Sequence, residues 1–221
     1  MRRKLNKTKQ ITLFILDKSG SMGSIRQTAI SGFNEYINVL KNNKVKNDFS
    51  LVLFDTESIE KPYFHTEMEK VEPLSEQTYK PMGGTPLYDA VVDAVEDLSN
   101  YVDEQSGKLV ITVAIMTDGE ENSSRKHDMK CMRELIEKLT AKGNWTFVYL
   151  GANQDAWANA ANYGIKAGNV LGWQSDLSGT IKAFNSLANA SVQYTANVAR
   201  GVSATAAFFN GGDKNVTQPQ P

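Results

Sequence analysis

The sequence predicts an α/β fold in which a doubly wound, mostly parallel sheet is flanked by helices on both faces. Three observations predict it. Short apolar runs alternate along the chain with amphipathic helical patterns. The run Leu109 to Met116 is continuous and rich in β-branched residues, which is typical of a central strand buried on both faces. Polar segments containing glycine follow the apolar runs, as expected where a strand ends and a loop begins.

The first half of the chain is predicted to form a strand, a helix and a second strand. Ile11 to Leu16 are six strand-forming residues. From Ser24 to Leu40, apolar residues recur at helical spacing with polar residues between them. Phe49 to Phe54 is the second apolar strand. Extended pieces are expected at Lys61–His65 and around Val71–Leu74.

The second half continues the alternation of helices and strands. A sharp Pro/Gly loop at residues 81–86 leads into the first of these helices. The last helix is weakly specified, because Ala, Asn and Ser make up much of it. In chain order we expect a helix at Leu87–Val102, a strand at Leu109–Met116, a helix at Asp128–Leu139, a strand at Trp145–Leu150, a short helix at Ala156–Tyr163, an edge strand at Asn169–Trp173 and the last helix at Gly179–Ala199.

Length and composition favour a single cytoplasmic domain. The 221 residues carry 24 Lys and Arg against 25 Asp and Glu, so no net field favours nucleic acid or an anionic membrane. No segment reaches the ~20 apolar residues that span a bilayer, and no signal peptide is evident. The single cysteine, Cys131, excludes an internal disulfide and is consistent with a reducing compartment. We expect a basic flexible arm at 1–9, the domain at 10–200 and a poorly ordered tail at 201–221.

Oxygen-bearing side chains follow the first predicted strand. Asp17, Ser19 and Ser21 alternate in sequence, so their side chains can face the same side. One carboxylate and two hydroxyls offer only oxygen, which suits Mg²⁺ or Mn²⁺ rather than zinc or copper. The alternative is that this Ser/Gly-rich turn caps the next helix.

Two further residues have both a structural and a metal-binding interpretation. Thr85 lies at the start of a predicted helix and can cap it, with Pro86 at the first helical position. Asp118 follows a buried strand, as Asp17 does, and binding sites in open parallel α/β sheets assemble at that edge. The alternative for Asp118 and Gly119 is an ordinary turn.

Taken together, three segments resemble the metal-ion-dependent adhesion site of von Willebrand factor type A domains. They are Asp17-Lys-Ser19-Gly-Ser21, Gly83-Gly84-Thr85-Pro86 and Thr117-Asp118-Gly119-Glu120. The resemblance covers roughly residues 10–199 and implies a Rossmann-like sheet. It also implies a stand-alone protein of bacterial or phage type. In such a site the hydroxyls of Ser19, Ser21 and Thr85 approach a Mg²⁺, Mn²⁺ or Ca²⁺ ion, and Asp17 and Asp118 act directly or through water.

The function implied is metal-dependent protein binding, not catalysis. Three neutral hydroxyls and two partly indirect carboxylates leave the cation short of negative charge, so an open coordination position attracts a partner's Asp or Glu. No nucleic-acid or membrane partner is expected. The resemblance also implies that the last predicted helix, 179–199, can shift when a ligand binds.

Two other functions compete with this expectation. The chain can be a scaffold that retains the metal site and binds partners through its helices. A phosphatase similar to the haloacid dehalogenases needs a second acidic residue where this chain has Ser19, so its general acid is missing. The two histidines, His65 and His127, lie in no recognisable nucleophile motif.

Overall fold

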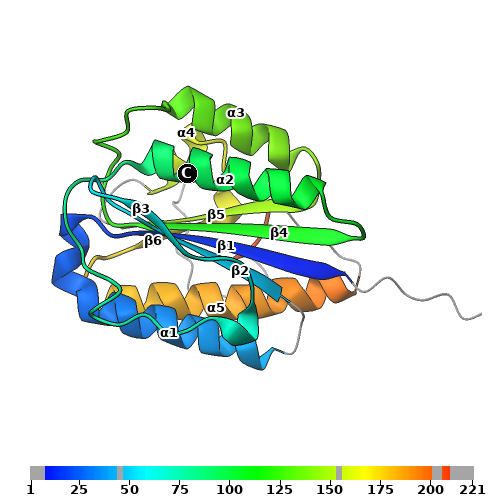
Figure 1. The fold of residues 1–221 in the computed structure, drawn as a ribbon, viewed down its shortest axis with the longest axis horizontal. Coiled ribbons are helices and arrows are strands. Elements are labelled where there is room, and N and C mark those ends of the chain that lie inside the picture. Colours follow the sequence, from blue (N-terminus) through cyan, green and yellow to red (C-terminus); the bar gives the residue numbers. More distant parts are fainter. Residues whose placement is uncertain (1–7, 44–46, 153–155, 201–205, 210–221) are drawn as a thin grey trace, which may run out of the picture.

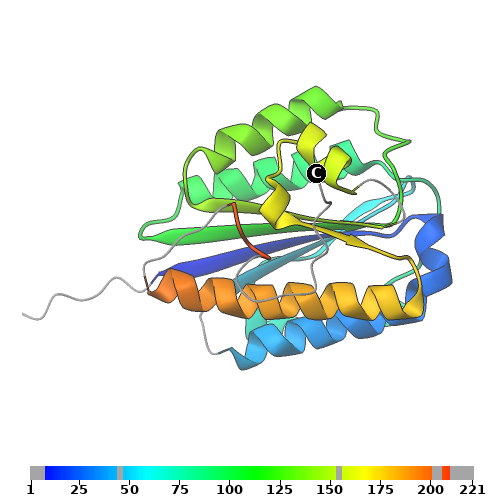
Figure 2. The same cartoon turned by 180° about the vertical axis from the view of Figure 1, so that it is seen from behind.

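A six-stranded sheet lies between two layers of helices (Figure 1). The computed structural model describes residues 8–43, 47–152, 156–200 and 206–209. One face of the sheet is covered by α2 (Leu87–Asp103), α3 (Met129–Thr140) and α4 (Ala156–Asn162). Figure 2 shows from behind that α1 (Arg26–Asn42) and α5 (Leu177–Ala199) run side by side across the other face. The predicted α/β class with helices on both faces is confirmed.

The sheet is parallel except at one edge. Its strands are β1 (Lys9–Asp17), β2 (Asn47–Phe54), β3 (Ile59–Glu67), β4 (Leu109–Thr117), β5 (Trp145–Ala152) and β6 (Val170–Trp173), arranged in the order β3-β2-β1-β4-β5-β6. Only β3 is antiparallel to its neighbour. The chain first builds outward from β1 through β2 and then crosses to β4 on the other side. The topological switch therefore lies between β1 and β4, where open α/β sheets bind ligands.

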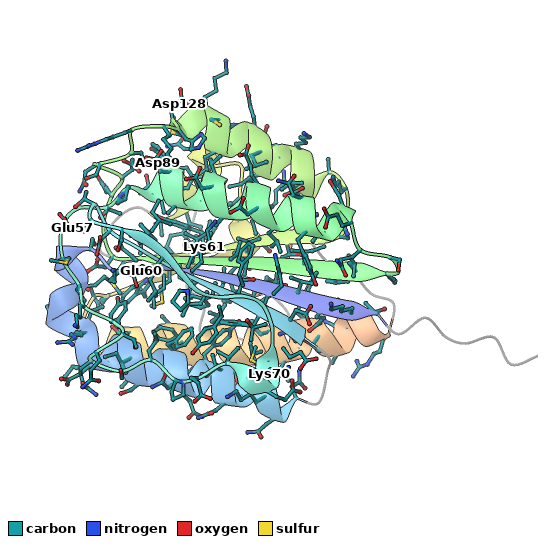
Figure 3. The ribbon with its side chains drawn as sticks, viewed as in Figure 1. Glu57, Glu60, Lys61, Lys70, Asp89 and Asp128 are labelled. Atoms are coloured by element: carbon teal, nitrogen blue, oxygen red, sulfur yellow. The ribbon has the colours of Figure 1, made fainter. Side chains whose placement is uncertain are left out.

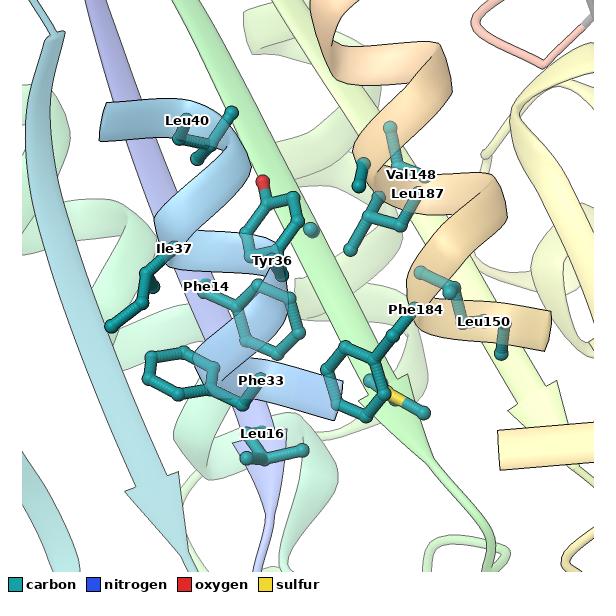
Figure 4. Close-up of a cluster of buried hydrophobic side chains, with 14 of the residues drawn as sticks. Phe14, Leu16, Phe33, Tyr36, Ile37, Leu40, Val148, Leu150, Phe184 and Leu187 are labelled. Carbon is teal, nitrogen blue, oxygen red and sulfur yellow. The ribbon is translucent and has the colours of Figure 1, made fainter. Parts of the chain in front are cut away.

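Each face of the sheet has its own apolar core. Every residue of β4 is buried, as predicted for a central strand. On the face covered by α1 and α5, the ring of Phe14 lies 5.4 Å from Tyr36, 5.7 Å from Phe33 and 6.2 Å from Phe184, measured between centroids (Figure 4). These contacts join β1 to both helices and fix the strand that ends at Asp17.

Two predicted elements differ from the structure. The segment predicted to begin a helix at Ser24 instead passes through a 3-10 turn, η1 (Gly20–Ile25), and the α-helix begins at Arg26. Residues 71–74 lie in no strand. Val71 and Leu74 are apolar because they are buried against α1 rather than in the sheet, and the Asn34 side chain holds Leu74 through two hydrogen bonds of 2.7 and 2.9 Å.

A few described residues from the segments predicted as arm and tail belong to the folded domain. β1 begins at Lys9, so the predicted arm ends before that residue, and residues 1–7 lie outside the described part. In the predicted tail, Phe208 and Phe209 are buried, and the Phe209 N–H donates to the Gly168 carbonyl at 3.0 Å. Residues 210–221 are not described. Within the described ranges, no helix has the length and apolarity to cross a membrane.

Candidate functional site

The two acidic residues of the predicted site lie next to each other at the carboxyl edge of the sheet. Asp17 is the last residue of β1, and Asp118 follows directly after the last residue of β4. These strands are parallel neighbours, with Leu16 paired to Met116, so both carboxylates leave the sheet at the topological switch. The fold therefore brings together residues 101 positions apart at its expected binding edge.

Asp17 is a fully buried carboxylate held by hydrogen-bond donors. Its Oδ1 accepts from the Ser19 N–H at 2.6 Å, and its Oδ2 accepts from the Thr117 hydroxyl at 2.5 Å. Burial raises the Asp17 pKa to about 6; the bonds from Thr117 and Ser19 act against this shift, and the nearby Asp118 carboxylate adds to it. Across the described residues, neither aspartate forms an ion pair with a basic side chain.

The two serine hydroxyls link Asp17's loop to Asp118. Ser19 Oγ lies 3.1 Å from Ser21 Oγ, and the Ser21 hydroxyl donates to Asp118 Oδ1 at 2.6 Å. Ser19 is buried whereas Ser21 is exposed, so the cluster opens to solvent at Ser21. Ser19 starts the 3-10 turn without a side-chain capping bond, and α1 begins further on, at Arg26. The alternative that this turn caps the next helix is therefore wrong.

Thr85 also belongs to the cluster and does not cap α2. The helix begins at Leu87, Pro86 occupies the capping position, and no side chain there makes a capping bond. A β-carbon added at Gly119 would lie 3.1 Å from Thr85 Oγ1 and 3.7 Å from Ser21 Oγ. Gly119 therefore lies close to both hydroxyls, and a larger residue there would press on Thr85 Oγ1.

The turn at Asp118 and Gly119 is held by Thr117 rather than by Asp118. The Thr117 hydroxyl, whose proton goes to Asp17 Oδ2, accepts from the Gly119 N–H at 3.1 Å. The Asp118 carboxylate faces the cluster instead, and its Oδ2 accepts from the Ser175 hydroxyl at 3.1 Å. The turn interpretation accounts for the backbone but not for the direction of this carboxylate.

The donor set is chemically suited to a hard divalent cation. It contains two carboxylates and three hydroxyls, and oxygen ligands of this kind suit Mg²⁺, Mn²⁺ or Ca²⁺. In the part of the chain that the structure describes, no group of three or more His, Cys, Asp or Glu is placed to hold a metal. The present cluster contains two residues of these four types, Asp17 and Asp118, and its other three oxygen atoms come from Ser and Thr hydroxyls.

Sequence reasoning missed two residues that support the site. The Tyr79 hydroxyl donates to the Asp17 carbonyl at 2.6 Å from within the core, a contact over 62 positions that no local pattern indicates. The Lys18 side chain is buried; it pairs with Glu60, and its ammonium lies 3.2 Å from Asp55 Oδ2. Because side chains alternate along an extended segment, the sequence indicates that Lys18 points away from Asp17 and Ser19. The sequence does not indicate that Glu60 and Asp55 are its partners.

The only cysteine lies beside a histidine, outside the predicted site. Cys131 Sγ is 3.6 Å from His127 Nδ1, and His127 Nε2 is 3.0 Å from Asp93 Oδ1. Burial raises the pKa of the Cys131 thiol, and neighbouring carboxylates such as Asp128 raise it further. The thiol form is therefore favoured, and this arrangement does not activate a nucleophile.

Comparison with known proteins shows the fold. No protein-family model matches the sequence, and no curated protein matches it. Among solved structures, proximal thread matrix protein 1 from the mussel byssus matches with a TM-score of 0.57 at 14% identity, over 83% of this chain and 46% of that one. A von Willebrand factor type A protein from Catenulispora acidiphila matches with a TM-score of 0.57 at 14% identity, over 84% of this chain and 43% of the other.

Two similar structures contain metal. The mussel protein has also been solved with zinc in its metal-ion-dependent adhesion site, and matches here with a TM-score of 0.57 at 15% identity, over 83% and 46% of the two chains. The manganese-loaded TRAP protein of Plasmodium vivax matches with a TM-score of 0.50 at 20% identity, over 79% and 71%. The present chain spans less than half the length of the mussel and Catenulispora chains. It has a von Willebrand factor A-like fold.

Proposed function

We propose that this chain is a protein-binding module that holds a divalent cation between Asp17, Ser19, Ser21, Thr85 and Asp118. The observation that carries the proposal is the convergence of five oxygen-bearing side chains from three separate segments at the β1/β4 switch. The metal-containing sites of the mussel and Plasmodium proteins support it by analogy of fold.

The charge balance of the cluster supports a cation. Two hydrogen bonds do not fully offset the cost of burying the Asp17 charge, because its pKa is still raised to about 6. Asp17 is buried next to a second carboxylate, Asp118, and the described residues place no basic side chain in an ion pair with either. A divalent cation between the two aspartates would supply the missing positive charge, and the hydroxyls of Ser19, Ser21 and Thr85 would complete its oxygen ligands.

The exposure of the cluster supports a partner that brings a carboxylate. Asp17, Ser19 and Thr85 are buried and close the site from the sheet side, whereas Ser21 is exposed. A bound Mg²⁺ would supply an open, positively charged coordination position on that exposed side. Because the protein's own ligands include only two carboxylates, an Asp or Glu of a partner can replace a water there.

A second function, scaffolding through the helices, is favoured by one observation. The outer face of α5 carries two exposed apolar side chains, Leu177 at 65% and Ile181 at 48% exposure. Partner binding through this helix would not depend on the metal. The two functions can be separated by capturing one purified partner in Mg²⁺ and in EDTA. Loss of capture in EDTA supports binding through the metal, and equal capture supports binding through the helices. The phosphatase alternative is not supported, because Ser19 stands where such an enzyme needs its general acid.

Ser21→Ala is expected to weaken Mn²⁺ binding by about tenfold or more, since an interaction with a charged group contributes about 1.5–3 kcal/mol. The free Mn²⁺ signal in electron paramagnetic resonance titrations measures this affinity. Ser31→Ala is the matched control, because Ser31 is also exposed but its hydroxyl donates to the Gln27 carbonyl within α1. Equal affinities for wild type and both variants would contradict the assigned ligand set.

A further inference from the structure

Two carboxylates outside the proposed ligand set join α2 to the loop that follows β4. Asp89 belongs to the first turn of α2 and Glu121 to the loop, and each binds N–H groups of the other's segment. We call these two residues and the N–H groups they bind the carboxylate clasp. Figure 3 labels Asp89 near the start of α2 and Asp128 at the start of α3. The clasp joins the start of α2 to the loop that leads into α3.

Asp89 binds the loop through its backbone. Asp89 is 7% exposed, and its carboxylate accepts from three consecutive N–H groups, those of Arg125 at 2.8 Å, Lys126 at 3.0 Å and His127 at 2.8 Å. In the described part of the chain it has no ion pair. Because these three donors are backbone groups, Asp89 holds the main chain of the loop at residues 125–127.

Glu121 completes the clasp from the loop side. Its Oε2 accepts from the Tyr88 N–H at 3.0 Å, which satisfies one of the free amides at the start of α2. Its Oε1 accepts from the N–H groups of Ser123 and Ser124, both at 2.7 Å. The Ser124 hydroxyl in turn accepts from the Asp89 N–H at 3.1 Å. Glu121 is thus a capping group with defined hydrogen-bond partners.

The clasp connects directly to two proposed metal ligands. Thr85 lies four residues before Asp89, and Asp118 lies three residues before Glu121. Between them, the Thr85 N–H donates to Asn122 Oδ1 at 2.9 Å and the Asn122 N–H donates to the Thr85 carbonyl at 3.1 Å. The clasp and the two Thr85–Asn122 bonds thus join the same two segments, the start of α2 and the loop after β4, from which Thr85 and Asp118 come.

We propose that Asp89 and Glu121 are positioning residues for the cation site, an inference that rests on the proposed function. Neither carboxylate needs to touch the metal. They hold Thr85 and Asp118 in one relative placement before the cation arrives, which removes an ordering cost from binding. Groups that orient metal ligands typically change metal affinity by about 10- to 100-fold when mutated.

The test is the Mn²⁺ affinity of Asp89→Asn, measured by paramagnetic resonance with metal alone. The Asn side chain has one acceptor oxygen in place of two, so the variant loses the hydrogen bond from the Arg125 N–H or the one from the His127 N–H. We expect affinity to fall about tenfold or more. Asp93→Asn is the matched control: it removes the same charge one turn further along α2, where the carboxylate's partners among the described residues are side chains of the loop, Lys126 Nζ and His127 Nε2. Its affinity should stay within about twofold, because Asp93 holds side chains of the loop and leaves the backbone bonds of the clasp in place.

Thermal unfolding without metal shows whether each variant is folded. Should Asp89→Asn fail to fold, Glu121→Gln provides the same comparison and should also bind Mn²⁺ more weakly. A folded Asp89→Asn or Glu121→Gln with wild-type affinity would overturn the positioning role while leaving the proposed function intact. An equal loss in Asp93→Asn would also overturn it, because charge alone would then explain the effect. Absence of Mn²⁺ binding in the wild type would instead refute the proposed function, and the positioning role with it.

Discussion

Asp17→Asn is expected to abolish divalent-cation binding while leaving the protein folded. The affinity of such oxygen sites is tuned over orders of magnitude by the number of charged ligands, so we expect a loss of roughly 100-fold or more. The amide retains the size of the carboxylate, and its oxygen can still accept from Thr117 or from the Ser19 N–H. Isothermal titration calorimetry with Mg²⁺ measures the change.

Thermal unfolding adds a second readout for Asp17→Asn. At pH 7.5, above the Asp17 pKa of about 6, the wild-type carboxylate is ionised and its burial costs free energy in the absence of metal. The variant lacks this cost, so without metal its Tm should equal or exceed that of the wild type. Excess Mg²⁺ should raise the wild-type Tm and leave that of the variant unchanged. A Mg²⁺-dependent rise of the same size in both proteins would rule out Asp17 as a ligand.

Phe14→Ala is expected to give a large loss of stability, about 3–5 kcal/mol of unfolding free energy. Phe14 is fully buried on β1, and its ring contacts the rings of Phe33, Tyr36 and Phe184 from both helices on that face. Removal leaves a cavity that helices packed on a rigid sheet can fill only in part. Urea unfolding followed by circular dichroism measures the difference.

Phe64→Ala is the matched control for the core prediction. Phe64 lies on the edge strand β3, is only half-buried, and contacts His65 and the Lys61 ammonium rather than the core rings. Phe64→Ala should therefore lower the free energy of unfolding clearly less than Phe14→Ala does. A loss at Phe14 no larger than that at Phe64 would mean that the α1/α5 face is not packed as described.

The fold was predictable because its signals are local. The predicted bounds of β4, α2 and α3 lie within one or two residues of the observed ones, because a continuous apolar run and helical spacing mark these elements locally. The errors arose where apolar residues serve another purpose. Val71 and Leu74 pack against α1 without joining the sheet, and Phe208 and Phe209, which lie in the predicted tail, are buried in the core.

The sequence motifs were enough to predict the proposed cation ligands but not the residues that support them. Asp17, Ser19 and Ser21 share an alternating pattern, and Asp118 repeats the strand-end position of Asp17, so their meeting at one edge follows from parallel pairing. The supporting groups carry no such signal. The Tyr79 contact and the bonds across the carboxylate clasp join residues that are distant in sequence, and only the tertiary structure brings them together.

The most direct test of the central claim is a crystal structure of the protein soaked in Mn²⁺, with anomalous diffraction to locate the ion. We predict one strong anomalous peak within coordination distance of oxygens from Ser19, Ser21 and Thr85, with Asp17 and Asp118 bound directly or through water. An ordered crystal with no peak at this edge of the sheet, or with its strongest peak elsewhere, would contradict the assignment of these five residues as a cation site.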